Sequence, residues 1–185
     1  MKILNGKYDP ILKEIVLLHN ITKRYILLGE ETDVKFNSYL QPIKEFRDSY
    51  DHILRIFKGI LFSNKETDEL YIQKQLSKAL GHEYRAFFDV ADWFSIICRS
   101  AAMDAIKNKE NNFKSIKNEF PEYEKQVDVI INSDQIIAKI REEKDVGGRI
   151  EGLVNRYQEM LVQLYDAMTY IRKATKLVEN DTNNA

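Results

Sequence analysis

Apolar residues recur at helical spacing along almost the whole chain. The clearest run lies between about Thr67 and Ala105, where the steps between apolar residues alternate between four and three and so trace one side of a helix. Between Ala86 and Cys98 the other side is largely apolar as well. A helix that is apolar nearly all round is normally buried on several sides, so we expect this long helix to lie in the middle of a bundle. The main apolar side consists of Leu76, Leu80, Tyr84, Phe87, Ala91, Phe94, Cys98, Ala101 and Ala105.

Further helices are predicted before and after this central one. Asp9 and Pro10 form a helix start, with Asp as the N-cap and Pro in the first turn, and Gly29 is a suitable C-terminal stop. Pro121 starts another helix after the central one. Residues 150–178 then repeat apolar residues over four heptads, which is typical of a bundle or coiled-coil seam. That seam is Ile150, Val154, Tyr157, Leu161, Leu164, Met168, Ile171, Thr175 and Val178.

The segment between the first and the central helix is predicted to be helical with an interruption. It begins near Thr32, and Pro42 should kink the helix or restart it. The opposite face from its apolar seam carries Asp48, His52 and Arg55. The predicted seam is Tyr39, Ile43, Phe46, Tyr50, Ile53, Phe57 and Ile60.

These patterns predict one fold class. The chain has only seven Gly and three Pro, and no alternating stretch is bounded by turn residues, so we expect no strands. The prediction is an all-α bundle of about five helices, two of them long with coiled-coil-like seams. Residues 1–178 would form a single helical-bundle domain and residues 179–185 a disordered polar tail. Seams that extend beyond a compact bundle also favour a homodimer, because a second chain can cover them.

A polar stripe crosses the apolar zone of the central helix. It consists of His82, Arg85, Asp89 and Asp92, which follow one another in steps of three, four and three and can therefore bond along the helix. The pair His82 and Arg85 repeats the spacing of His52 and Arg55. Two interpretations remain open: a semi-buried ladder of ion pairs at a helix contact, or a pair of functional His–Arg elements.

Composition narrows the function classes. The formal net charge of −1 gives no general footprint for nucleic acid or an anionic membrane. We expect no membrane span and a cytoplasmic protein, because no apolar run is long enough for a signal peptide core or a span. No cofactor and no metal are expected: phosphate-binding and dinucleotide-binding glycine motifs are missing, and three His and one Cys are too few for a closed zinc site. The single Cys98 is interpreted as a structural thiol.

One short motif carries candidate chemistry. Phe46-Arg47-Asp48-Ser49-Tyr50-Asp51-His52 contains an Arg followed by four residues and a His. This resembles the RNA-cutting motif of the HEPN family, small all-helical domains of which many are metal-independent ribonucleases that act as dimers. The resemblance covers about a tenth of the chain. It implies that Arg47 would clamp the phosphate, His52 would act as the acid/base and Asp48 would orient one of them.

Two main hypotheses therefore stand, beside a third in which the bundle binds an apolar ligand among its aromatic side chains. The first is a non-enzymatic helical interaction protein, regulatory or accessory, that acts on a protein partner through helix–helix contacts. The alternative is a HEPN-like endoribonuclease that acts on RNA. Residues five apart on an ideal helix differ by about 140°, so Arg47 and His52 converge only through a kink or a second subunit. A purely structural pairing of Asp48 with His52, one turn apart, is the other interpretation of the motif.

Overall fold

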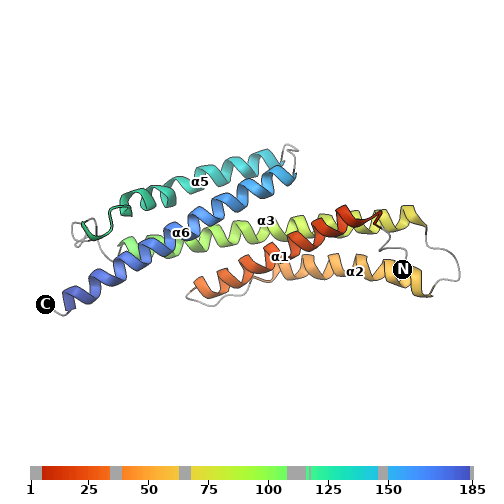
Figure 1. Cartoon of the computed structure of the whole chain (residues 1–185), viewed down its shortest axis with the longest axis horizontal. Helices are drawn as coiled ribbons and strands as arrows, with labels where there is room; N and C mark the ends of the chain where they lie inside the picture. The colour runs from red at the N-terminus through yellow and green to blue at the C-terminus, as the bar shows by residue number, and fades with distance from the viewer. Residues whose placement is uncertain are drawn as a thin grey trace. The chain divides into compact units, whose positions relative to one another are not determined.

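The computed structural model describes residues 6–33, 39–62, 68–107, 116, 118–145 and 150–183. The described residues form helices and contain no strand, which confirms the predicted all-α class. The central helix, with 39 residues, and the last helix, with 34, are the two long ones that the sequence predicted. The helices are α1 (Asp9–Thr32), α2 (Gln41–Phe62), α3 (Glu69–Lys107), α5 (Tyr123–Asp145) and α6 (Ile150–Asn183) (Figure 1).

Local signals explain where α1 and α2 begin. The amide of Leu12 donates to the carbonyl of Tyr8 at 3.0 Å, so the first helical bond forms just before the Asp–Pro pair. The helix continues past Gly29, which the sequence suggested as its end, to Thr32. The amide of Lys44 donates to the carbonyl of Leu40 at 3.2 Å. Pro42 therefore lies in the first turn of α2 and restarts the helix, because that turn needs no bond from its missing N–H.

A side-chain cap starts α3. The carboxylate of Asp68 accepts a hydrogen bond from the amide of Leu70 at 3.0 Å, which is the geometry of an N-cap. The same residue's carbonyl accepts from the amide of Ile72 at 3.1 Å. This cap fixes the start of α3 close to the Thr67 that the periodicity indicated.

The chain packs as two compact units. The first contains α1 up to Glu30, α2, and α3 up to Asp92; the second contains the rest of α3 from Trp93, followed by α5 and α6. The sequence pattern had predicted a single domain over residues 1–178. The helix α6 also continues to Asn183, into the stretch predicted as a tail, and residues 184–185 lie outside the described ranges.

The first unit has an apolar core at one end, where its three helices meet. Tyr8 and Ile15 of α1 pack there with Ile56 of α2 and with residues of α3. Partly buried neighbours from α1, α2 and α3 close over this core. The contribution of α3 is Ile72, Leu76 and Ala79.

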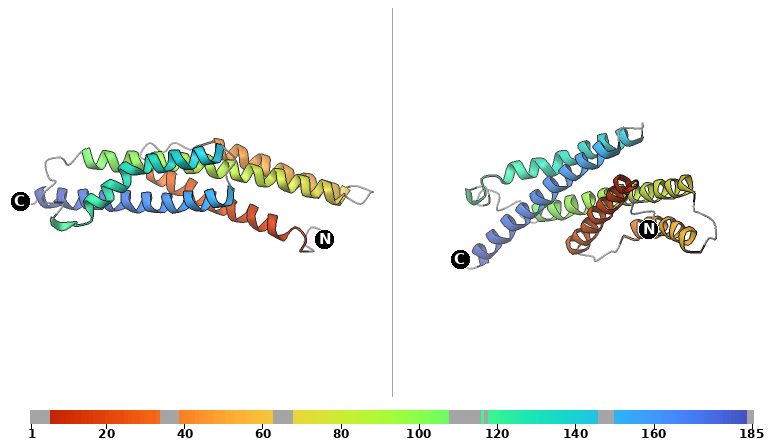
Figure 2. Two further views of the ribbon diagram at one scale, coloured as in Figure 1. Left: turned by 90° about the horizontal axis from the view of Figure 1, so that it is seen from above. Right: turned by 45° about the vertical axis from the view of Figure 1, so that its right-hand side comes forward.

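The second unit is built on α5 and α6, which run side by side in opposite directions (Figure 2). Aromatic pairs support the packing: the ring of Phe94 in α3 stacks on Tyr165 of α6 with centroids 5.9 Å apart, and Phe120 meets Tyr170 edge to face at 5.8 Å. The heptad prediction for α6 is confirmed wherever side chains are described, which excludes Ile150 and Val178. The buried positions are Val154, Tyr157, Leu161, Leu164, Met168, Ile171 and Thr175.

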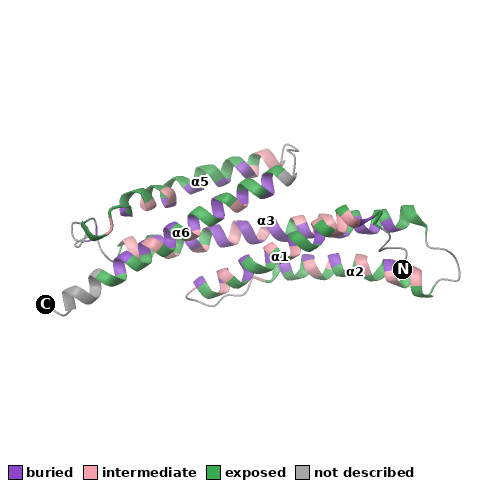
Figure 3. Cartoon of the chain, in the orientation of Figure 1, coloured by how far each residue is buried: buried purple, intermediate pink, exposed green. Residues whose placement is uncertain are grey.

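The predicted apolar seam of α2 is confirmed only in part. Ile53, Phe57 and Ile60 are partly buried and pack against the apolar core, whereas Ile43 and Tyr50 are exposed, so the prediction was wrong for these two. Exposed positions recur along α2 (Figure 3), and its buried residues are Pro42, Glu45, Ser49 and Ile56. On the face predicted to look outward, His52 turns inward and bonds to Gln75 of α3, as described below, whereas Arg55 is exposed.

Within the described ranges, none of the helices carries an apolar stretch of the length that crossing a membrane requires.

Candidate functional site

The three histidines of the chain gather inside the first unit, one from each helix. His19 belongs to α1, His52 to α2 and His82 to α3. The imidazole rings of His52 and His82 stack with centroids 5.3 Å apart and planes inclined by 28°. The two His–Arg elements therefore meet through their histidines, a relation that the sequence had left open.

Glu45 is the centre of an inward-facing ion cluster. Its Oε2 lies 2.8 Å from Nδ1 of His82 and accepts a hydrogen bond from Nε of Arg85 at 2.9 Å. Burial alone would raise the pKa of the Glu45 carboxyl, but the bonds from His82 and Arg85 together outweigh it and lower that pKa. The carboxylate is therefore held in its charged form.

The Nδ1 atom of His82 has two neighbours of opposite character. It lies 2.6 Å from Nη2 of Arg85 as well as 2.8 Å from the Glu45 carboxylate. With a proton on Nδ1 the ring donates to Glu45; without it the ring accepts from Arg85. The two contacts therefore cannot be hydrogen bonds at the same time.

His52 extends the cluster towards the apolar core. Its Nδ1 lies 2.7 Å from Oε1 of Gln75, an oxygen that can only accept, so the ring nitrogen donates. Gln75 is itself buried on α3. This bond and the stack on His82 hold the His52 ring inside the helix contact.

Glu83, which follows His82 on α3, forms a second polar site. It is 3% exposed, and its Oε2 lies 3.5 Å from Nδ1 of His19. Burial raises the pKa of the Glu83 carboxyl, and the nearby Ser49 hydroxyl and His19 imidazole oppose the rise only in part. Neither Glu83 Oε2 nor Ser49 Oγ has a hydrogen-bond partner among the described residues.

These unsatisfied atoms lie at a pocket of about 190 Å³ between α1 and α2. The His19 ring closes one side of it and packs against Phe46, with ring centroids 4.4 Å apart. Most of its wall is apolar or aromatic, whereas Glu83 and Ser49 supply buried oxygens. The lining residues are Ile15, Val16, His19, Asn20, Phe46, Ser49, Tyr50, Ile53 and Glu83.

The structure separates the residues of the predicted ribonuclease motif. Arg47 lies on the outside of α2, where its guanidinium bonds to the carboxylate of Asp48 at 2.7 and 3.0 Å. That bond lowers the pKa of Asp48. His52 instead points inward to Gln75, and no hydrogen bond joins it to Arg47 or Asp48 in the part of the chain that the structure describes.

The remaining residues of the predicted stripes divide in the same way. Arg55 pairs with Asp51 one turn earlier, at 2.7 Å on the exposed side of α2. Asp89 and Asp92 act on Tyr39, whose pKa is raised first by burial and then by the charges of these two carboxylates. Of the predicted stripe on α3, only His82 and Arg85 therefore join the cluster around Glu45.

Sequence reasoning missed Glu45, Ser49, Gln75 and Glu83, and interpreted His19 as structural. A signal was available for α2: Glu45, Ser49 and His52 follow steps of four and three, the spacing of an inward-facing side. A solvated polar face has the same spacing, so this signal alone does not distinguish a polar helix contact from a surface.

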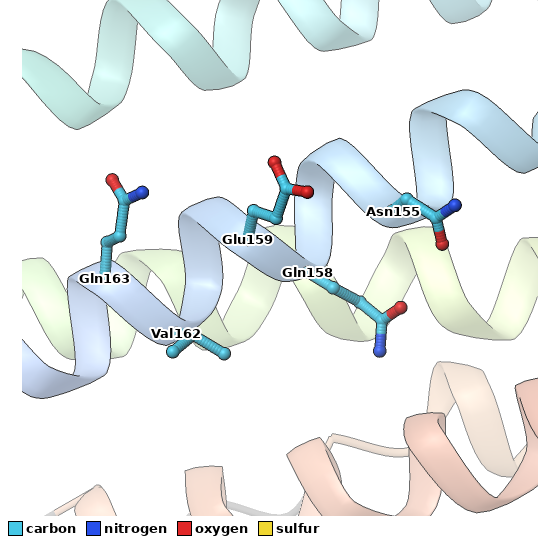
Figure 4. Close-up of a pocket in the computed structure, with 5 residues that line it drawn as sticks. All are labelled: Asn155, Gln158, Glu159, Val162 and Gln163. Atoms are coloured by element: carbon cyan, nitrogen blue, oxygen red, sulfur yellow. The ribbon is translucent and has the colours of Figure 1, made fainter.

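Other features of the described chain offer less chemistry. No group of three or more His, Cys, Asp or Glu side chains among the described residues is arranged to hold a metal ion. Cys98 is buried and free, and burial raises the pKa of its thiol to about 12, which keeps it protonated and inert. A hollow on α6 is lined by side chains of that helix alone, which spread along its surface (Figure 4); none of them is buried.

Comparison of the chain with protein-family models, with curated proteins and with solved structures finds no match. The functional argument therefore rests on the geometry of the chain itself.

Proposed function

We propose that this chain is a non-enzymatic helical interaction module that pairs with a second copy of itself through the outer face of α2. One observation carries the proposal: large apolar side chains stand exposed along that face in steps of helical spacing. The exposed fraction is 72% for Leu40, 60% for Tyr50 and 65% for Leu61. A surface helix normally turns such residues to a core, so a contiguous exposed stripe is typical of an interaction site.

The stripe, which we call the α2 seam, repeats like one side of a coiled coil. Its members are spaced alternately by three and four residues and lie roughly opposite to the buried face of α2, about 140° around the helix. Ile43 and Leu54 are exposed apolar members beside those named above, whereas Phe57, at the same spacing, packs against the apolar core of the first unit. The α2 seam is therefore Leu40, Ile43, Arg47, Tyr50, Leu54 and Leu61.

The α2 seam is complementary to itself when two copies lie antiparallel. In one register Ile43 of each copy meets Leu54 of the other, and Arg47 meets Tyr50, a cation–π contact. Along the flank, Lys44 of one copy then faces Asp51 of the other, which places opposite charges together. Self-complementarity is what a two-fold interface requires, and it favours a second copy over an unrelated partner.

Mass measurement tests the proposal. Analytical ultracentrifugation should show a concentration-dependent dimer in the unmodified chain, and Leu54→Glu should weaken its association by more than tenfold, because a charge would be buried in the seam. Val162→Glu, at a similarly exposed position of α6, is the matched control and should leave association unchanged. A chain that stays monomeric at all concentrations, or a Leu54→Glu chain that pairs as before, refutes the proposal.

Charge exchange tests the register. Lys44→Asp and Asp51→Lys should each weaken the dimer, and the double variant should restore it, because the facing charges are then opposite again. Circular dichroism of each variant checks that the helices are retained.

The ribonuclease hypothesis remains a separate prediction with its own assay. It expects RNA cleavage without added metal that is lost in both Arg47→Ala and His52→Ala. The structure holds these side chains on different faces of α2, so a site would need a second subunit to complete it. Cleavage that depends on both residues would replace the interaction proposal as the leading function.

A further inference from the structure

The pocket between α1 and α2 combines a largely apolar wall with buried oxygen atoms. Its wall is formed by aliphatic and aromatic side chains, including Ile15, Phe46 and Ile53. Deep in it are the oxygens of Glu83 and Ser49, residues that are 3% and 1% exposed. A buried oxygen without a partner destabilises the fold, so a bound group that donates hydrogen bonds to it would be favoured.

The polar atoms of the pocket determine whether it favours a positively or a negatively charged ligand. Glu83 Oε2 is an acceptor without a partner, and Ser49 Oγ adjoins it as a second unsatisfied atom. The lining includes no Lys and no Arg. An anion would meet the Glu83 carboxylate without a compensating fixed charge, whereas a cation with N–H donors would neutralise it.

His19 does not remove the need for such a donor. Its Nδ1 lies 3.5 Å from Glu83 Oε2, beyond the usual length of a hydrogen bond between nitrogen and oxygen. The imidazole is also partly exposed and held against the Phe46 ring.

The volume of the pocket limits the size of the apolar part of the ligand. An apolar cavity of about 150 Å³ holds a benzene ring, so the pocket, at about 190 Å³, has room for one ring with a short charged substituent. Tyr50 and Phe46 supply aromatic faces for that ring and for its charge.

We propose that the α1–α2 pocket binds a small organic cation, an aromatic or alkyl ring that carries one ammonium group, with the ammonium donating to Glu83 and Ser49 and the ring packed among Ile15, Phe46 and Ile53. This inference does not depend on pairing through the α2 seam, because it concerns the interior of one copy.

Methyl-labelled protein allows a direct test. Benzylammonium is the probe, benzyl alcohol its neutral counterpart and benzoate its anionic one. The δ-methyl signals of Ile15 and Ile53 should shift with benzylammonium, and those of Ile137, which is buried in α5 of the second unit, should not. Benzyl alcohol should bind about tenfold more weakly, since its hydroxyl can still donate to the carboxylate but brings no positive charge, and benzoate should not bind.

A variant pair isolates the carboxylate. Glu83→Gln keeps the shape of the side chain and should weaken the binding of benzylammonium by about tenfold, while Asp166→Asn removes an exposed carboxylate of α6 and should leave that binding unchanged. No shift at Ile15 and Ile53 up to millimolar probe overturns the inference. Equal affinity for benzyl alcohol and benzylammonium, or an unchanged affinity for benzylammonium in Glu83→Gln, overturns the assignment of the ligand as a cation. The methyl shifts and the comparison of the probes use unmodified protein, so they remain valid even if a variant fails to fold.

Discussion

The two units of the chain bury polar groups in different ways. In the second unit the buried hydroxyls whose bonds are defined satisfy themselves locally: Ser133 donates to the carbonyl of Ile130, and Thr175 donates to that of Ile171. In the first unit the buried polar side chains include Glu45 and Glu83, and they interact across helices. Among the described residues, the second unit therefore buries hydroxyls but no charged side chain, whereas the first also holds charge in its interior, where charge is costly and therefore informative.

The largest expected change in the free energy of unfolding concerns the apolar packing of the second unit. Leu164→Ala should lower the free energy of unfolding by about 3 kcal/mol, because Leu164 is fully buried in α6 and its removal leaves a cavity. Val162→Ala, two residues earlier and exposed, is the control and should cost less than about 0.5 kcal/mol. Urea denaturation followed by circular dichroism measures both. Similar values for the two variants would show that the second unit is not held by this packing.

A smaller effect is expected when the ion cluster of the first unit is broken. Glu45→Ala leaves His82 and Arg85 without their carboxylate, and should lower the free energy of unfolding by about 2 kcal/mol. The loss stays below that of a fully buried pair because the Arg85 side chain is half exposed and regains water. Asp51→Ala, which removes only the exposed pair with Arg55, should cost less than about 0.5 kcal/mol. An equal loss in both variants would mean that the cluster contributes no more than a surface pair.

Much of the fold followed from the sequence, but the orientation of α2 did not. Apolar periodicity was sufficient for α3 and α6, whose buried residues coincide with the predicted sides at Phe87, Phe94 and Leu164. On α2 the same rule was right for Ile53, Phe57 and Ile60, which pack against the core. It was wrong for Ile43 and Tyr50, which lie outside while Glu45 and Ser49 lie inside. Hydrophobicity alone cannot identify the buried face of a helix whose polar residues bond to other helices, because those partners are distant in sequence.

The candidate site was predictable only in fragments. His52, His82 and Arg85 were singled out from their spacing, but Glu45 lies 37 residues from His82 and no local pattern links them. His19 and Glu83 are separated even further. Their meeting depends on how three helices pack, and the sequence of one helix does not contain that information.

The finest test of the comparison uses pH, because Glu45 and Glu83 should respond with opposite signs. The pKa of Glu45 is lowered from its ordinary 4.5, so its stabilisation is present above that pH and is lost as the pH falls through the folded-state value. The pKa of Glu83 is raised from the same 4.5. Stability should therefore decline as the pH rises from there through its folded-state value.

Two conservative variants separate these contributions. In Glu45→Gln the difference from the unmodified chain should shrink as the pH falls below 4.5. In Glu83→Gln the stability of the variant relative to the unmodified chain should increase as the pH rises above 4.5, because a neutral amide is easier to bury than a carboxylate. Denaturation at a series of pH values measures both, and slopes of the same sign would contradict the structure.

The gathering of all three histidines in the first unit has a spectroscopic consequence. The chain contains no other imidazole. Every histidine ring resonance in a proton or nitrogen NMR spectrum therefore originates from the first unit, and the second unit contributes none. The stacked rings of His52 and His82 should also shift each other's signals through their ring currents. The chemical shifts of the three imidazoles therefore report on the first unit alone during a titration, without any added label.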